Sequence, residues 1–97
     1  MRVYLDYKIL IAKKAQKILE NLDIVERTKI VVKVKLLNTE NIKTLNIKKL
    51  QGYKDLYRLR VDDFRVIYKV YAKGKLLIVA VVGQRKNIYH LIKRSSL

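Results

Sequence analysis

The stretch YRLRVDDFRVIYKV, residues 57 to 70, decides the fold of this chain. Its two halves are rich in the β-branched and aromatic residues that fit a pleated surface. The Asp-Asp pair at 62–63 between them is typical of a tight turn. The stretch therefore predicts two antiparallel strands, over 57–61 and 64–70, joined as a hairpin.

A two-residue turn at 62–63 fixes the register of this hairpin. It places Arg60 directly opposite Arg65 on one face of the sheet, and Arg58 shares that face because side chains alternate along a strand. Like charges that face each other across strands are destabilising, so three arginines there call for a polyanion or an acidic partner. An ordinary solvated face is the alternative interpretation.

Further strands are expected on both sides of the hairpin. A Lys-Gly pair at 73–74 predicts a second turn, and the run 76–82 is apolar at every position, as in a strand covered on both faces. We expect Gly83 to end this strand and Asn87 to cap a short final helix. An alternating run over 45–49 predicts one more strand ahead of the hairpin.

The first part of the chain has a helical pattern. Residues 3–7 are compatible with a short edge strand, and Asp6 is well placed to cap a helix. Residues 8–22 then carry apolar side chains at helical spacing and predict an amphipathic helix with a basic outer face. Residues 24–38 fit one helical face but also alternate like a strand over 32–36, so the residues alone leave both structures open.

The charge balance points to polyanionic partners. The chain has 23 Lys and Arg against 8 Asp and Glu, a formal net charge of +15. Nucleic acid, an acidic protein and an anionic membrane all attract such a surface, in that order of preference. Arginine rather than lysine occupies positions 58, 60, 65 and 85, and a guanidinium binds phosphate oxygens in a bidentate way.

Composition also excludes several classes of protein. The chain has no cysteine, so it has no disulfide framework and no thiolate metal site. No segment approaches the roughly 20 apolar residues needed to cross a bilayer. We expect a single domain over residues 1–97 in the cytoplasm.

Four motifs in the second half match the pattern of a known family. They are LQG at 50–52, YRLR at 57–60, FRVIY at 64–68 and VGQRKNIY at 82–89. Together they resemble the RelE/ParE toxin superfamily. The resemblance implies an α+β fold with two N-terminal helices packed on one face of a small, mainly antiparallel sheet. The implied order is β-α-α-β-β-β with a short C-terminal helix, which favours a helix over residues 24–38.

The RelE branch implies an mRNA interferase of a type II toxin–antitoxin system. This is an endoribonuclease that cleaves mRNA in the ribosomal A site, where the RNA's own 2′-hydroxyl attacks the adjacent phosphate. The resemblance implies no metal and no cofactor. The family's basic positions fall on Arg58, Arg60, Arg65 and Arg85, and its C-terminal tyrosine falls on Tyr89. Of these, the expected catalytic residues are Arg60, Arg65, Arg85 and Tyr89. Such a reaction needs a base, positive charge around the phosphate and a proton donor for the departing 5′-oxygen.

Each candidate residue has an expected role in this reaction. Arg60 and Arg65, with Arg58, would clamp and neutralise the phosphate, whereas Tyr89 exchanges a proton more readily than a guanidinium does. For Arg85, charge stabilisation is preferred to proton donation for the same reason. The expected RNA-binding residues are Arg58, Lys54 and Lys86.

His90 is not expected to act in catalysis, because it points away from its neighbour Tyr89 and has no second histidine to form an acid–base pair. Asp62 and Asp63 are interpreted as turn formers rather than metal ligands.

The resemblance also implies partners. They are a cognate acidic or amphipathic antitoxin of the RelB kind, the ribosome with its mRNA, and operator DNA reached only through the antitoxin; no membrane partner is implied. Two other functions fit the same residues: a ParE-like toxin that poisons gyrase, and a basic nucleic-acid- or ribosome-binding module without catalysis.

Overall fold

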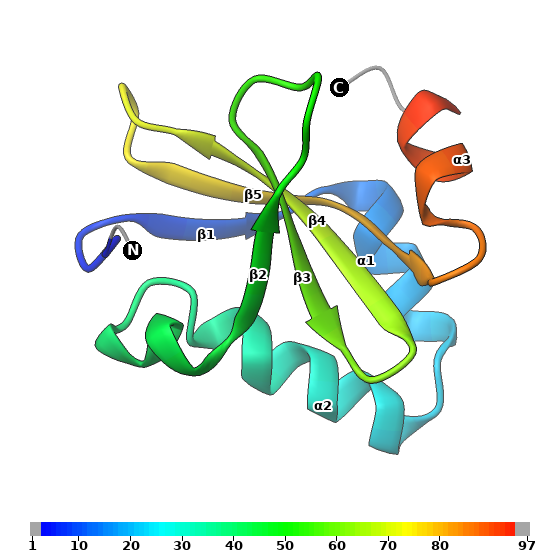
Figure 1. The fold of residues 1–97 in the computed structure, drawn as a ribbon. Helices are drawn as coiled ribbons and strands as arrows, with labels where there is room; N and C mark the ends of the chain where they lie inside the picture. The colour runs from blue at the N-terminus through cyan, green and yellow to red at the C-terminus, as the bar shows by residue number, and fades with distance from the viewer. Residues whose placement is uncertain (1–2, 95–97) are drawn as a thin grey trace.

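The computed structural model describes residues 3–94 and confirms the predicted architecture (Figure 1). The elements are β1 (Lys8–Ile11), α1 (Lys13–Asn21), α2 (Ile24–Lys35), the 3-10 helix η1 (Glu40–Thr44), β2 (Asn46–Lys49), β3 (Leu56–Val61), β4 (Phe64–Tyr71), β5 (Leu76–Gln84) and α3 (Ile88–Arg94). Two helices precede a mainly antiparallel sheet and a short helix follows it. The alternating run before the hairpin forms the short edge strand β2, as its residues predict, and the observed order has one strand more than the order that the resemblance implies.

The five strands form one sheet in the order β1-β5-β4-β3-β2. β1 runs parallel to β5, and the other neighbours are antiparallel. The predicted hairpin register is confirmed, because Arg60 pairs with Arg65 across β3 and β4. Asp62 takes up a left-handed φ of 52°, which aspartate tolerates better than most residues and which the tight turn requires.

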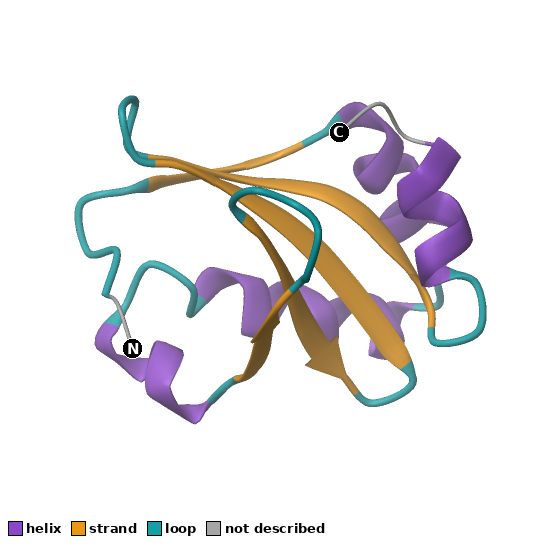
Figure 2. Ribbon diagram, turned by 45° about the horizontal axis from the view of Figure 1, so that its top comes forward, coloured by secondary structure: helices purple, strands orange, loops and turns teal. Residues whose placement is uncertain are grey.

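Each face of the sheet buries its own apolar cluster. The larger cluster packs α1 and α2 against one face, and its centre includes Leu59 and Val66. The smaller cluster lies on the other face, where Ile88 and Ile92 of α3 cover Ile67 of β4. Figure 2 shows the twisted sheet with α2 below it and α3 at its right-hand end. One end of the second face is thus covered by α3, and the arginines stand beside it.

The beginning of the chain differs from the prediction. The first strand is Lys8–Ile11 rather than residues 3–7, and α1 starts at Lys13. The prediction failed because Ile11 fits the helical spacing of α1 as well as it fits a strand. Asp6 does not cap α1; its carboxylate accepts a hydrogen bond from Lys75 Nζ at 2.6 Å, and the cap position holds Ala12 without a side-chain hydrogen bond.

The end of β5 also differs. The strand continues through Gly83 to Gln84, and Gly83 pairs with Arg65 of β4. Gly83 does not end the strand. Its role is to leave room for α3 to pack against β5, since a Cβ on Gly83 would stand 2.7 Å from Leu91 Cδ1. A register shift at Ile67/Tyr68 interrupts the β4–β5 ladder.

α2 removes the ambiguity over residues 24–38. It is a helix as far as Lys35, and Asp23 caps it by accepting a hydrogen bond from the Glu26 backbone N–H at 2.9 Å. The strand-like alternation at its end reflects exposed and buried positions on a helix, with Val32 exposed and Val34 buried. No helix in the part of the chain that the structure describes is long and apolar enough to span a membrane.

Candidate functional site

The arginines that sequence reasoning selected gather around one pocket. It has a volume of about 320 Å³ and lies on the sheet face opposite α1 and α2. Its lining residues are Arg58, Arg60, Arg65, Arg85, Ile88 and Tyr89. β3 supplies two of the arginines, β4 supplies the third, and the segment from the end of β5 into α3 supplies the rest. We call this hollow the arginine pocket.

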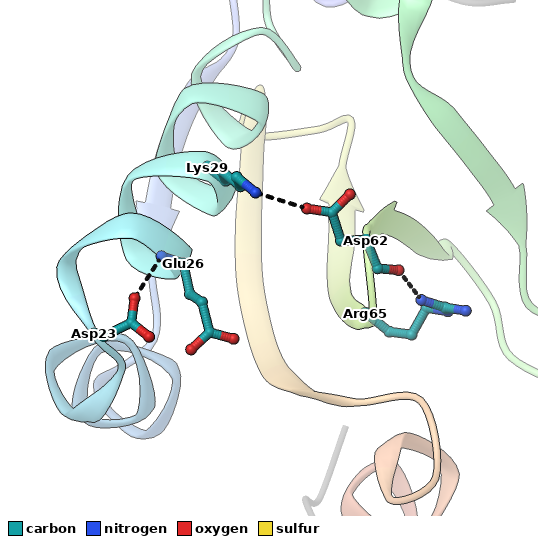
Figure 3. Close-up of polar contacts among 5 residues, drawn as sticks. All are labelled: Asp23, Glu26, Lys29, Asp62 and Arg65. Carbon is teal, nitrogen blue, oxygen red and sulfur yellow. Dashed lines mark hydrogen bonds and ion pairs between the residues drawn. The ribbon is translucent and has the colours of Figure 1, made fainter.

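Arg65 is the buried member of the group, with 6% of its surface exposed. Its Nη1 donates hydrogen bonds to the backbone carbonyl of Asp62 at 2.9 Å and to that of Phe64 at 3.0 Å. Figure 3 shows Lys29 and Arg65 reaching Asp62 from opposite sides, Lys29 through an ion pair of 3.4 Å. The hairpin turn and the guanidinium therefore hold each other in place.

The surroundings of Arg65 are electrostatically unfavourable to a cation. Burial lowers the pKa of its guanidinium most. Three neighbouring positive charges lower that pKa further: Arg60, Arg58 and Arg85. Since a guanidinium stays protonated at physiological pH, this crowding costs stability rather than charge. A bound phosphate would relieve the repulsion.

Arg58 is oriented by the edge strand. Its Nη2 donates a hydrogen bond to Asn46 Oδ1 at 2.9 Å, across the β2–β3 ladder. Its Nε is buried and has no hydrogen-bond acceptor among the described residues. Buried donors nearly always have a partner in native proteins, so an unpaired one in a basic pocket is consistent with a site for a ligand oxygen. Sequence reasoning missed Asn46, although the alternation of β2 was the signal for its face.

Arg85 and Tyr89 complete the pocket from its other side. The Arg85 backbone N–H donates to the carbonyl of Asp63 at 3.0 Å, which ties the end of β5 to the hairpin turn. Tyr89 stands on α3 directly after the buried Ile88, with 60% of its surface exposed. Its position at the pocket therefore depends on the packing of α3 against the sheet.

The two predicted RNA-binding lysines lie elsewhere. Lys54 lines a separate pocket with Tyr71 and Lys69, at the far end of β4. Lys86 is exposed and is absent from the lining of the arginine pocket, and His90 is exposed and absent from it as well. The structure thus brings together the four arginines and Tyr89, but neither lysine.

Acidic side chains gather next to the hairpin turn, outside the arginine pocket. Asp23 and Glu26 lie at the start of α2, near Asp62 and Asp63 (Figure 3). The backbone N–H of Glu26 lowers the pKa of Asp23, whereas Asp23 raises the pKa of Glu26. Across residues 3–94, no three His, Cys, Asp or Glu side chains are grouped so that they could hold a metal ion.

Comparisons with known proteins point to one family. No protein-family model matches the chain. Toxin RelE3 of Methanocaldococcus jannaschii is 40% identical over 52 residues, which are 54% of this chain and 57% of that toxin. The match thus spans little more than half the length of this curated relative.

Solved structures match over more of the chain. The archaeal RelE–RelB complex from Pyrococcus horikoshii OT3 shares 30% identity and a TM-score of 0.69, covering 81% of this chain and 94% of the matched one. The RelB–RelE complex from Methanococcus jannaschii shares 31% identity and a TM-score of 0.68, covering 82% and 94%. The isolated RelE toxin of E. coli shares 26% identity and a TM-score of 0.66, covering 91% and 97%.

Fold and pocket together define a RelE-like α+β protein, with a helix pair on one sheet face and an arginine pocket on the other. The aligned chains at 30% and 31% identity are covered almost completely. This chain belongs to the RelE toxin family.

Proposed function

We propose that this protein is the toxin of a type II toxin–antitoxin system and acts as a ribosome-dependent endoribonuclease. It would inhibit translation by cleaving mRNA in the A site, without a metal ion. The observation that carries this proposal is the arginine pocket, in which four guanidinium groups and one phenol surround a space of about 320 Å³. That combination suits a phosphodiester in a strand of RNA.

The chemistry follows from charge and proton balance. The 2′-oxygen attacks the neighbouring phosphorus, the bond from phosphorus to the 5′-oxygen breaks, and a cyclic phosphate and a 5′-hydroxyl remain. The negative charge grows on the phosphoryl oxygens in the five-coordinate state, where fixed cations are most effective. Arg65 and Arg60 supply that charge from the sheet, and Arg85 supplies it from the opposite side.

Tyr89 is the proton-transfer group of the proposal: its phenolic oxygen takes the proton of the attacking 2′-hydroxyl as a proton passes to the departing 5′-oxygen, so no proton is gained or lost overall. Its hydroxyl is the one neutral, exchangeable side-chain donor among the residues lining the arginine pocket. Arg85 stabilises the departing 5′-oxygen by charge, since a guanidinium releases its proton poorly. No residue of the pocket requires a metal or a cofactor for this sequence of steps.

The partners follow from charge and from the relatives. Two of the matched structures are complexes of RelE with RelB. With a net charge of +15, this chain would bind an acidic or amphipathic antitoxin of that kind, and operator DNA would be contacted only through the antitoxin.

The test is cleavage on programmed ribosomes. Purified protein is mixed with ribosomes that hold a defined mRNA, and primer extension locates the cuts. We expect cuts within the A-site codon and none in the same mRNA without ribosomes. Intact mRNA together with gyrase-linked DNA breaks would instead support the ParE-like activity. The absence of both mRNA cuts and DNA breaks would support a binding module without catalysis.

A further inference from the structure

A second pocket opens beside the arginine pocket and is used by none of the steps above. It also has a volume of about 320 Å³. Its polar lining comes from the end of β2, the following loop, β3 and α3: Lys48, Lys49, Gln51, Tyr53, Arg58 and Tyr89. Arg58 and Tyr89 line both pockets, so the two hollows are neighbours that share a wall. We call the second one the tyrosine pocket.

Charge distinguishes this pocket from the other hollows around the site. Among the described residues, no acidic side chain lines either the arginine pocket or the tyrosine pocket. The groove of about 630 Å³ between α2 and β3, which shares Arg60, includes Asp62. The hollow at the hairpin turn includes Glu26 and Asp63. Both of those hollows also hold Lys29, but a phosphate chain that leaves the arginine pocket meets carboxylates in their directions and none in this one.

The side chains of the tyrosine pocket complement a nucleotide. Tyr53 and Tyr89 leave 37% and 60% of their surfaces exposed, which makes aromatic ring surface available for stacking. Gln51 offers an amide that can both donate to and accept from a base edge. Lys48 and Lys49 supply ammonium groups for a phosphate.

We propose that the tyrosine pocket binds a ribonucleotide adjacent to the scissile phosphate. Its base stacks on Tyr53, and its phosphate contacts Lys48 and Lys49. Arg58, with its unpaired Nε, stands between the two phosphates. This assignment rests on the proposed function, because it takes the substrate to be single-stranded RNA that continues out of the arginine pocket.

The test measures RNA binding apart from cleavage. The full chain is titrated into a short, fluorescein-labelled single-stranded RNA with 2′-O-methyl groups, which remove the attacking hydroxyl, and anisotropy gives the Kd. We expect Tyr53→Ala to weaken binding about 10-fold, the effect typical of losing one stacking ring. Tyr53→Phe keeps the ring and should bind like the wild type, which separates stacking from misfolding.

The chain offers a matched control in Tyr71. It is 41% exposed and also lies among lysines, but it lines the pocket at the far end of β4. Tyr71→Ala should leave the Kd within about twofold of wild type. Lys48→Ala and Lys49→Ala should each reduce the slope of log Kd against log salt by about one, as expected for one lost phosphate contact.

Several results would overturn the assignment. They are a wild-type Kd for Tyr53→Ala, an equal loss for Tyr53→Ala and Tyr71→Ala, or no RNA binding by the wild-type chain. A poly-glutamate peptide that competes equally well and shows the same dependence on Tyr53 would identify an acidic protein as the occupant instead.

The two proposals fail in different ways. Tyr53-dependent binding of the RNA without any cleavage on ribosomes would contradict the nuclease and leave the nucleotide site standing. Normal ribosomal cleavage by Tyr53→Ala, with unchanged RNA affinity, would remove the nucleotide site and leave the nuclease.

Discussion

Gly83 of β5 and Leu91 of α3 approach each other so closely that a Cβ on the glycine would lie 2.7 Å from Leu91 Cδ1. The absence of a side chain at Gly83 thus lets α3 pack on the sheet, and α3 carries Tyr89. A site residue on a helix is therefore positioned by a glycine on a strand.

Replacing Gly83 should disturb the site more than the fold. In Gly83→Ala, Leu91 must move away, so α3 is loosened, whereas the larger apolar cluster on the other face is untouched. We expect cleavage to fall about 10-fold and the free energy of unfolding to fall by about 1 kcal/mol, the low end of the cost of overpacking, because the clash is with the end of a leucine side chain that can rotate. Hydrogen exchange at the amides of α3 should accelerate.

Gly74→Ala is the control for this change. A Cβ there meets Leu76 at an ordinary 3.7 Å, so activity and exchange in α3 should match the wild type. Unchanged exchange in α3 of Gly83→Ala would contradict the positioning role.

Arg85 and Tyr89 carry the chemical prediction. Arg85→Ala and Tyr89→Phe should each reduce ribosomal cleavage by orders of magnitude, since one removes charge from the reacting phosphate and the other removes the exchangeable proton. Both side chains are exposed, so circular dichroism and Tm should stay near those of the wild type. Lys93→Ala, an exposed change on α3, the helix that carries Tyr89, is the control. Full activity in Tyr89→Phe would exclude proton transfer by the phenol.

Replacing Arg60 tests whether this residue lowers the stability of the fold while it supports cleavage. It faces Arg65 directly, and among the charged neighbours it is the largest cause of the lowered Arg65 pKa. Arg60→Gln removes that repulsion and should raise the free energy of unfolding by roughly 0.5 kcal/mol while lowering cleavage. The gain should shrink in high salt, because the repulsion is screened. A lower Tm in this variant would show that Arg60 stabilises the empty pocket.

The Asp6–Lys75 ion pair predicts a pH dependence. Lys75 lowers the pKa of Asp6, so this contribution to stability is present above the unfolded pKa of aspartate and is lost as pH falls through the lowered folded value. Asp6 in turn raises the pKa of Lys75, so the same pair is also lost as pH rises through that raised value. Urea midpoints of Asp6→Asn should lie below wild type near pH 7 and converge with it toward pH 3. The double variant with Lys75→Gln should add no further loss near pH 7.

The hairpin could be predicted from sequence because its information is local. Alternation fixes the faces of β3 and β4, the paired aspartates fix the turn, and together they place Arg60 against Arg65. The same alternation brings Tyr57 next to Tyr68, whose rings stack at 5.6 Å. The positions of Arg85 and Tyr89 at the same pocket were implied only by resemblance, since they depend on how α3 packs.

Other features of the fold and the site depend on contacts between residues that are far apart in the sequence, so a short stretch of sequence does not predict them. β1 is four residues long and is a strand because it pairs with β5, whereas its own residues fit a helix equally well. Gly83 stays within β5 because α3 lies over it. Lys48 and Tyr53 become neighbours of Tyr89 only when the loop after β2 closes, through a hydrogen bond of 3.0 Å from the Leu50 backbone N–H to the Leu56 carbonyl.

The parallel pairing of β1 with β5 has a consequence for synthesis. β1 finds its partner only after β5, at residues 76–84, has been made, and such long-range pairing slows folding. α3, with Tyr89, is made later still. A chain made only as far as β4 therefore lacks both the completed sheet and Tyr89, so the arginine pocket is not complete until β5 and α3 have followed.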